Sequence, residues 1–196
     1  MMNVGVLALQ GAFARHVEAL TDLGVEAFEV RNQGQLDRCD AIVLPGGEST
    51  TMSKLLDTFE LAEPLAKMVA DGLPTFGTCA GMILLASAIS DGRPDQHAFG
   101  AIDIDVRRNG YGRQIDSFET DLVIPELGPE PFTAVFIRAP VVEACRGTVQ
   151  VLASVDGDPV LCRQDSVLVA SFHPELTDDR RLHRYFVEQV AGFDVD

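Results

Sequence analysis

A cysteine lies between two glycines where a predicted strand gives way to a predicted helix. The apolar run at residues 73–76 is typical of a buried strand, and a helical pattern at residues 80–88 begins directly after Cys79. Gly77, Cys79 and Gly81 have the spacing of a nucleophile elbow, a sharp turn that presents a reactive side chain. Unpaired N–H groups at the helix N-terminus favour a thiolate. The segment predicts a nucleophilic thiol, although a lone cysteine is more often a buried structural residue.

A histidine and a glutamate two positions apart follow the predicted strand at residues 167–171. In an extended segment His173 and Glu175 point to the same side, and Pro174 stiffens the link between them. The carboxylate can then orient the imidazole, which accepts the thiol proton. Cys79, His173 and Glu175 therefore form a candidate catalytic triad. The alternative is a strand-end histidine that caps the helix predicted at residues 177–190.

A pair of glycines closes the predicted strand at residues 41–44. After this strand, Gly46 and Gly47 can turn backbone N–H groups toward a ligand, and Glu48 can hold a cationic amine. An ordinary strand-to-helix loop would have the same composition. The segment indicates a ligand-binding loop only in combination with the elbow and with the His-x-Glu pair.

Together these segments resemble the class I, or triad, glutamine amidotransferases. Within that family the similarity is greatest to the glutaminase subunits of pyridoxal 5′-phosphate synthases, and it extends through nearly the whole chain. The elbow and the His-x-Glu segment mark the family. The subgroup is indicated by Arg-Asn-x-x-Gly-Arg-Gln at residues 108–114 and by Ile-Arg-Ala-Pro at residues 137–140.

The resemblance implies that L-glutamine is the substrate. A free amino acid carries one ammonium and one carboxylate, so its site needs an acid and a guanidinium. By resemblance, the substrate-binding residues are Gly47, Glu48, Ser49, Arg108, Ile137 and Arg138. The tetrahedral oxyanion needs preorganised donors, for which the backbone N–H groups of Ala80 and of Gly46 or Gly47 are the candidates.

The resemblance also implies a partner. The ammonia would pass to a TIM-barrel synthase subunit that makes pyridoxal 5′-phosphate, within a large hetero-oligomer. No cofactor and no metal ion are expected for this chain itself. Three alternatives stay open: a glutaminase subunit of another biosynthetic pathway, a cysteine peptidase or chaperone of the related elbow-containing superfamily, and a non-catalytic flavodoxin-like binding module.

The order of predicted elements indicates an α/β fold. Strands and helices alternate in the first half, which predicts a doubly wound, mainly parallel sheet with flanking helices, and later strands suggest a mixed or antiparallel extension. We expect a single flavodoxin-like domain over residues 1–196. Gly46, Cys79 and His173 each follow a predicted strand end, so one crevice can hold all three. His16 and His183 are expected to be surface or satisfied core histidines, and residues 90–100 a surface excursion.

Composition excludes several functions. Thirty acidic residues oppose fifteen basic ones, for a formal net charge of −15, so nucleic-acid binding is not expected. Lysine occurs only at positions 54 and 67, a bias that favours a salt-adapted protein over an ordinary acidic one. The four cysteines lack CxxC spacing, which argues against zinc and disulfides and favours the cytoplasm. No apolar run approaches the roughly 20 residues of a membrane span, and no signal peptide is expected.

Overall fold

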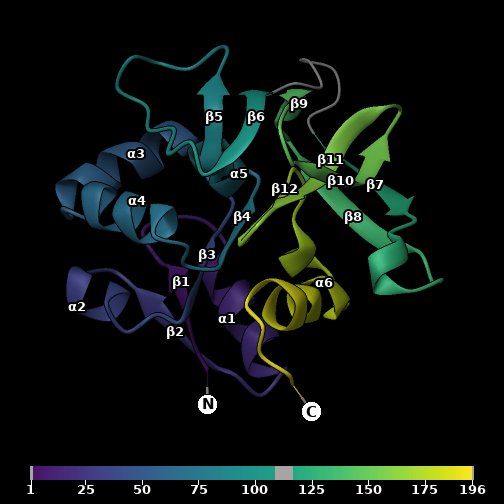
Figure 1. Cartoon of the computed structure of the whole chain (residues 1–196), viewed down its shortest axis with the longest axis horizontal. Coiled ribbons are helices and arrows are strands. Elements are labelled where there is room, and N and C mark those ends of the chain that lie inside the picture. The colour runs from purple at the N-terminus through teal and green to yellow at the C-terminus, as the bar shows by residue number, and fades with distance from the viewer. Residues whose placement is uncertain (1, 109–116, 196) are drawn as a thin grey trace.

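A large twisted sheet runs through the centre of the molecule (Figure 1). The computed structural model describes residues 2–108 and 117–195, so most of the 108–114 subgroup segment lies outside the described residues. Within the described residues the main sheet has seven strands, in the order β10 (Gln150–Val155), β11 (Asp158–Gln164), β12 (Val167–Ala170), β4 (Thr75–Thr78), β3 (Ala41–Leu44), β1 (Asn3–Leu7) and β2 (Glu26–Val30).

The main sheet is parallel from β12 to β2, whereas β10 and β11 add an antiparallel edge. This arrangement confirms the predicted fold class. Four of the five parallel strands are buried along most or all of their length, as a sheet covered on both faces requires.

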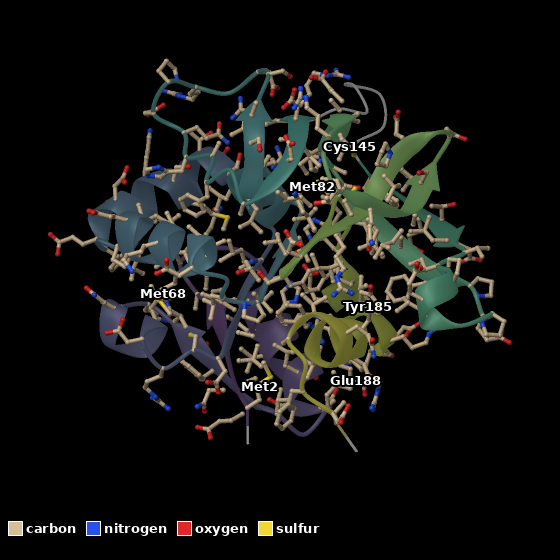
Figure 2. All side chains as sticks on the ribbon, viewed as in Figure 1. Met2, Met68, Met82, Cys145, Tyr185 and Glu188 are labelled. Carbon is tan, nitrogen blue, oxygen red and sulfur yellow. The ribbon has the colours of Figure 1, made fainter. Side chains whose placement is uncertain are left out.

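Two apolar layers cover the main sheet. One contains α1 (Phe13–Thr21), α6 (Arg181–Tyr185) with the π-helical turn η3 (Phe186–Val190), and the antiparallel hairpin of β7 (Ser117–Leu122) and β8 (Phe132–Ile137), which are joined through η1 (Pro125–Leu127). The other contains α2 (Gln33–Leu36), α3 (Ser49–Thr58), α4 (Ala62–Ala70), α5 (Ala80–Leu85) and the small sheet of β5 (Ala86–Ile89), β6 (Ile102–Arg107) and β9 (Val141–Cys145). Met82 of α5 lies fully buried near the middle of the molecule (Figure 2).

The strand order places three loops at one edge of the sheet. Strand β4 lies between β3 and β12, and the register pairs Gly77 of β4 with both Leu44 and Val169. The three strands are parallel, so their carboxyl ends meet, and the segments that begin after Leu44, Thr78 and Ala170 share one edge.

Two predicted helices were wrong in extent. The helix expected at residues 80–88 ends at Leu85, because Ala86 begins β5, which pairs with β6. The strand β9 was missed. The helix expected at residues 177–190 begins only at Arg181, since Pro174 and Leu176 bound a short 3₁₀ turn, η2, and Thr177 is extended. Pairing across the chain overrode local propensity in the first case.

Within residues 2–108 and 117–195, no helix is long and apolar enough to cross a bilayer.

Candidate active site

Cys79 occupies a strained turn between β4 and α5. It is the N-cap of α5 and has φ 49° and ψ −102°, a backbone conformation that a side chain with a Cβ rarely adopts. Such a conformation costs on the order of 1–3 kcal/mol and persists only when the surrounding structure enforces it. The strain and the strand-to-helix position are those of a nucleophile elbow.

The two elbow glycines are required by close packing. A Cβ on Gly81 would overlap the carbonyl oxygen of Leu44 at the end of β3. A Cβ on Gly77 would lie 2.7 Å from the carbonyl carbon of Gly81 and 2.6 Å from a methyl group of Leu85. The elbow is therefore pressed against the neighbouring strand with no room for a side chain.

His173 is oriented by Glu175. Its Nδ1 lies 2.8 Å from Oε1 of Glu175, and its backbone N–H donates to the carbonyl of Val135 at 2.8 Å. Burial by itself would lower the pKa of His173, but the neighbouring Cys79 sulfur and Glu175 carboxylate outweigh burial and raise the pKa to about 10. The imidazole is therefore poised as an imidazolium between a sulfur and a carboxylate.

Gly46 packs directly against the histidine and the cysteine. A Cβ on Gly46 would be 2.9 Å from Nδ1 of His173 and 3.4 Å from Cβ of Cys79. The loop after β3 thus touches both candidate catalytic residues, and the three strand ends converge as their order in the sheet requires.

On the side away from His173, Glu175 faces two buried histidines, neither of which was expected to belong to the site. Oε2 of Glu175 lies 3.3 Å from Nε2 of His16, whose Nδ1 lies 3.0 Å from Nε2 of His183. Both histidines are fully buried. Burial acts to raise the pKa of Glu175, but the imidazoles of His16 and His173 outweigh it and lower the pKa below its usual range. The sequence indicated only that His16 and His183 lie in segments with a helical pattern.

A pocket of about 300 Å³ opens beside Cys79 and His173. Each residue predicted to bind the substrate lines it. Its lining consists of Gln10, Gly47, Glu48, Ser49, Cys79, Ile83, Arg108, Ile137, Arg138 and His173. The volume suits a small ligand such as a free amino acid.

Glu48 is held at the N-terminus of α3. Its carboxylate accepts hydrogen bonds from the backbone N–H groups of Thr50 and Thr51, at 3.1 and 2.7 Å, and from both hydroxyl groups. Burial acts to raise the pKa of Glu48, but these hydrogen bonds lower it to about 2. The backbone N–H of Glu48 donates to Oε1 of Gln10 at 3.0 Å. Glu48 is therefore a fixed negative charge on the wall of the pocket.

Arg108 and Ser49 are joined by Gln96, which was not among the predicted site residues. Gln96 accepts a hydrogen bond from Nη1 of Arg108 at 3.2 Å and donates to the hydroxyl of Ser49 at 2.8 Å. Nη1 of Arg108 also donates to the hydroxyl of Thr50 at 3.0 Å. The segment expected to be a surface excursion thus packs on α3 through Gln96, an interaction that no spacing rule indicates.

Ile137 and Arg138 close the pocket at the end of β8. The carbonyl oxygen of Ile137 lies 3.9 Å from Sγ of Cys79, and Arg138 has φ 43°. Arg138 is exposed, and both residues line the pocket. A positively charged side chain therefore borders the pocket that also holds Glu48.

The proposed oxyanion donors belong to the residue after Cys79 and to the loop after β3. Ala80 directly follows Cys79 and is buried, a Cβ on Gly46 would lie 3.4 Å from Cβ of Cys79, and Gly47 lines the pocket. Their role as oxyanion hole stays a prediction. No group of three or more His, Cys, Asp or Glu side chains that could hold a metal ion occurs among the described residues.

A parallel α/β fold whose cysteine elbow meets a His-x-Glu segment defines the triad glutamine amidotransferases as a class. The chain belongs to the SNO glutamine amidotransferase family, whose model matches residues 6–192. It is similar to a crystal structure described as a glutamine amidotransferase, with 49% identity and a TM-score of 0.89 over 96% of this chain and 98% of that one. The family resemblance is thereby confirmed.

Relatives named pyridoxal 5′-phosphate synthase subunit PdxT match nearly end to end. The protein of Carboxydothermus hydrogenoformans is 56% identical over 97% of this chain and 98% of its own. That of Mycobacteroides abscessus is 57% identical over 96% and 97%. The structure of PurLQS from Thermotoga maritima, at 15% identity and a TM-score of 0.66 over 96% of this chain and 98% of that one, shares the fold alone.

Proposed function

We propose that this chain is a glutaminase that hydrolyses the side-chain amide of L-glutamine to glutamate and ammonia. One observation carries the proposal: Cys79 and His173 line the same small pocket as a fixed carboxylate and an exposed guanidinium. The pocket thus combines a nucleophile and a base with charges that match the ammonium and the carboxylate of a free amino acid.

In the first half-reaction the thiolate of Cys79 attacks the amide carbon of glutamine. The resulting oxyanion is stabilised by backbone N–H groups, for which Ala80 and either Gly46 or Gly47 are our candidates. His173, held as an imidazolium, gives its proton to the leaving nitrogen. Ammonia departs and a glutamyl thioester remains on Cys79.

In the second half-reaction His173 accepts a proton from water, which attacks the thioester carbonyl. Glutamate is released, and the thiolate and imidazolium are restored. Glu175 keeps the Nδ1 proton of His173 toward itself at 2.8 Å, so that the other ring nitrogen faces the reacting atoms.

We further propose that Glu48 and Arg138 bind the two charges of the substrate. Arg138→Lys keeps the charge but loses the planar fork that binds a carboxylate with two hydrogen bonds. We expect KM for glutamine to rise on the order of 10-fold or more, with a smaller change in kcat. Steady-state kinetics measures both, and an unchanged kcat/KM would remove Arg138 from the site.

Glu48→Gln needs a matched control, because Glu48 also caps α3. Thr51→Val removes one hydrogen-bond donor to that carboxylate and leaves its charge in place. We expect both variants to lose stability, by about 0.5–2 kcal/mol for a weakened cap, but only Glu48→Gln to raise KM strongly. Equal KM values in the two variants would assign Glu48 to helix capping alone.

The ammonia is used by a partner, we propose. Relatives of the same length carry the name of a pyridoxal 5′-phosphate synthase subunit, which supports a role in vitamin B6 biosynthesis. We propose that a TIM-barrel synthase subunit receives the ammonia within a large hetero-oligomer in the cytoplasm. Free thiols at Cys39, Cys79, Cys145 and Cys162 are in keeping with a reducing compartment.

The function is tested by covalent labelling. The full chain, alone and mixed with the synthase subunit, is exposed to a glutamine analogue that carries an electrophile and is then examined by mass spectrometry. We expect one adduct, on Cys79, that excess glutamine prevents. Labelling that glutamine does not slow would argue for a peptidase-like or chaperone-like thiol, and no adduct in either sample would favour a binding module.

The same samples test control by the partner. We expect the isolated chain to be slow and the synthase subunit to accelerate it by aligning the loop at Gly46 and Gly47, a coupling of about 1–3 kcal/mol, or roughly 5- to 150-fold in rate. Ammonia release measured with and without the synthase decides the matter. Equal rates would mean that the isolated site is already preorganised.

A further inference from the structure

A chain of buried polar groups extends the candidate triad into the protein. Oε1 of Glu175 contacts His173, whereas Oε2 faces His16 at 3.3 Å. His16 in turn contacts His183 at 3.0 Å, and both side chains are fully buried. The proposed mechanism uses neither histidine, yet a buried imidazole pair is costly to desolvate and needs a reason.

The contacts determine which ring nitrogens carry protons. Within the described part of the chain, Nδ1 of His183 is buried and has no hydrogen-bond partner. A neutral His183 with its proton on Nε2 avoids an orphaned N–H there and donates to Nδ1 of His16. Burial lowers the pKa of His183 to about 3, so this ring is neutral.

His16 must then accept at Nδ1 and carry its own proton on Nε2. That N–H faces both Oε2 of Glu175 and the hydroxyl of Thr78, each at 3.3 Å. The approach to Oε2 is long, and among the described residues this oxygen has no well-aligned hydrogen bond. The N–H of His16 is therefore shared between Oε2 and the hydroxyl of Thr78. It stabilises the carboxylate mainly through the direction of its dipole and not through a short hydrogen bond.

Among the titratable groups that the structure describes near Glu175, His16 is the one besides His173 that faces its carboxylate. His173 precedes it on the same segment, α1 supplies His16, and α6 with its N-cap supplies His183 and Arg180. Strand β8, which packs on the η2 turn that contains Glu175, carries no titratable side chain. A carboxylate that is 3% exposed would otherwise tend to take up a proton, which would abolish its hold on His173.

We propose that His16, with its tautomer held by His183, is a positioning residue for the glutaminase reaction. It keeps Glu175 ionised and its Oε1 directed at His173. The proposal rests on the proposed glutaminase function. It predicts that the length and direction of the side-chain donor at position 16 set the pH range over which the enzyme works.

The test compares two amides at position 16. The amide of His16→Gln reaches the place of Nε2 and keeps a donor toward Glu175, whereas that of His16→Asn reaches only the place of Nδ1. His16→Leu removes both ring nitrogens. The full chain is assayed with the synthase subunit, and kcat, KM and the pH profile of kcat/KM are recorded.

We expect His16→Asn and His16→Leu to lower kcat on the order of 10- to 100-fold with KM nearly unchanged, the range seen for residues that orient the ligands of metal sites. Their acid limb of kcat/KM should move to higher pH by about one unit or more, because Glu175 then protonates more readily. His16→Gln should retain most of kcat and the original acid limb.

Phe186→Leu is the matched structural control. Phe186 is fully buried and packs on Phe76 with ring centroids 5.5 Å apart, and Phe76 also borders His16 and His183. It should lower Tm without moving the acid limb. If His16→Leu does not fold, the comparison of kcat and of the acid limb between His16→Gln and His16→Asn tests the proposal instead.

An acid limb that is the same in wild type, His16→Gln and His16→Asn would overturn the proposal and leave the histidine pair as core packing. So would equal losses in Gln and Asn that merely follow Tm. A wild-type complex that releases no ammonia would instead refute the glutaminase function itself, so the two failures are distinguishable.

Discussion

At the scale of single residues, the proposed chemistry depends on three side chains that meet at one edge of the sheet. Cys79→Ala and His173→Asn should lower kcat by roughly 10⁴-fold or more, because the nucleophile or its proton carrier is gone. Glu175→Gln should cost less, since the base remains but its orientation is lost.

Ammonia release by the purified variants, together with a circular dichroism spectrum of each, measures these effects. The spectra should match that of the wild type, which separates lost chemistry from lost folding. Cys79→Ser is the sharpest check: turnover like that of the wild type would show that Cys79 is not the nucleophile.

The protonation of His173 gives an independent prediction. Burial lowers the pKa of His173, but Cys79 and Glu175 outweigh it and raise the pKa from 6.5 to about 10. A raised pKa means that the imidazolium stabilises the fold fully below about pH 6.5, and that this contribution is lost as the pH rises through about 10.

The difference in Tm between wild type and His173→Asn should therefore shrink as the pH is raised from about 7 to about 10. Differential scanning calorimetry in a pH series measures it, and Asn is a fair reference because it does not titrate. A difference that is constant across this range would speak against an imidazolium in the native site.

At the scale of elements, the elbow depends on contact between α5 and the end of β3. Gly81→Ala would place a methyl group on the carbonyl oxygen of Leu44, so β3 and α5 must separate. We expect a loss of about 1–3 kcal/mol in the free energy of unfolding. We also expect a fall in kcat, because Cys79 moves with α5.

Gly34→Ala is the control for this prediction. Gly34 lies in α2, where an added Cβ would be 3.6 Å from the nearest atom, Oδ1 of Asn32, and would make ordinary contact. We expect this variant to be neutral or more stable by about 0.5–1 kcal/mol, since alanine favours a helix over glycine. Urea unfolding of both variants decides: equal stability would show that the elbow tolerates a side chain.

At the scale of the whole molecule, charge is the dominant property. A net charge of −15 repels itself most at low ionic strength, where the Debye length is about 10 Å at 0.1 M salt and about 3 Å at 1 M. We therefore predict that Tm rises between roughly 0.1 and 2 M KCl, with most of the gain at the lower end.

Thermal unfolding in a KCl series measures the rise, and replacing several surface aspartates by lysine should flatten it. A continued rise at multimolar salt would indicate ion exclusion and strengthened burial instead of screening. A Tm that is flat or falls with salt would leave the acidity as ordinary solubility charge, and the prediction of salt adaptation would be wrong.

Much of the site could be predicted from local sequence, because the chemistry of an elbow or of a His-x-Glu pair needs particular residue types at short spacings. Gly77, Cys79 and Gly81 lie within five residues, and so their backbone geometry follows from the chain itself. The α/β class followed in the same way from the alternation of strands and helices. The end of α5 did not, because β5 forms only where β6 is available to pair with Ala86.

The sequence by itself determined the residue types that can do chemistry, the approximate elements and the excess of negative charge. Only the tertiary structure decided that Gln96 joins Arg108 to Ser49, and that His16 and His183, 167 positions apart, stand behind Glu175. Periodicity shows that a histidine lies on a buried helix face, but not which group it meets there. That depends on how two helices pack on one face of a sheet, a long-range outcome that no local pattern contains.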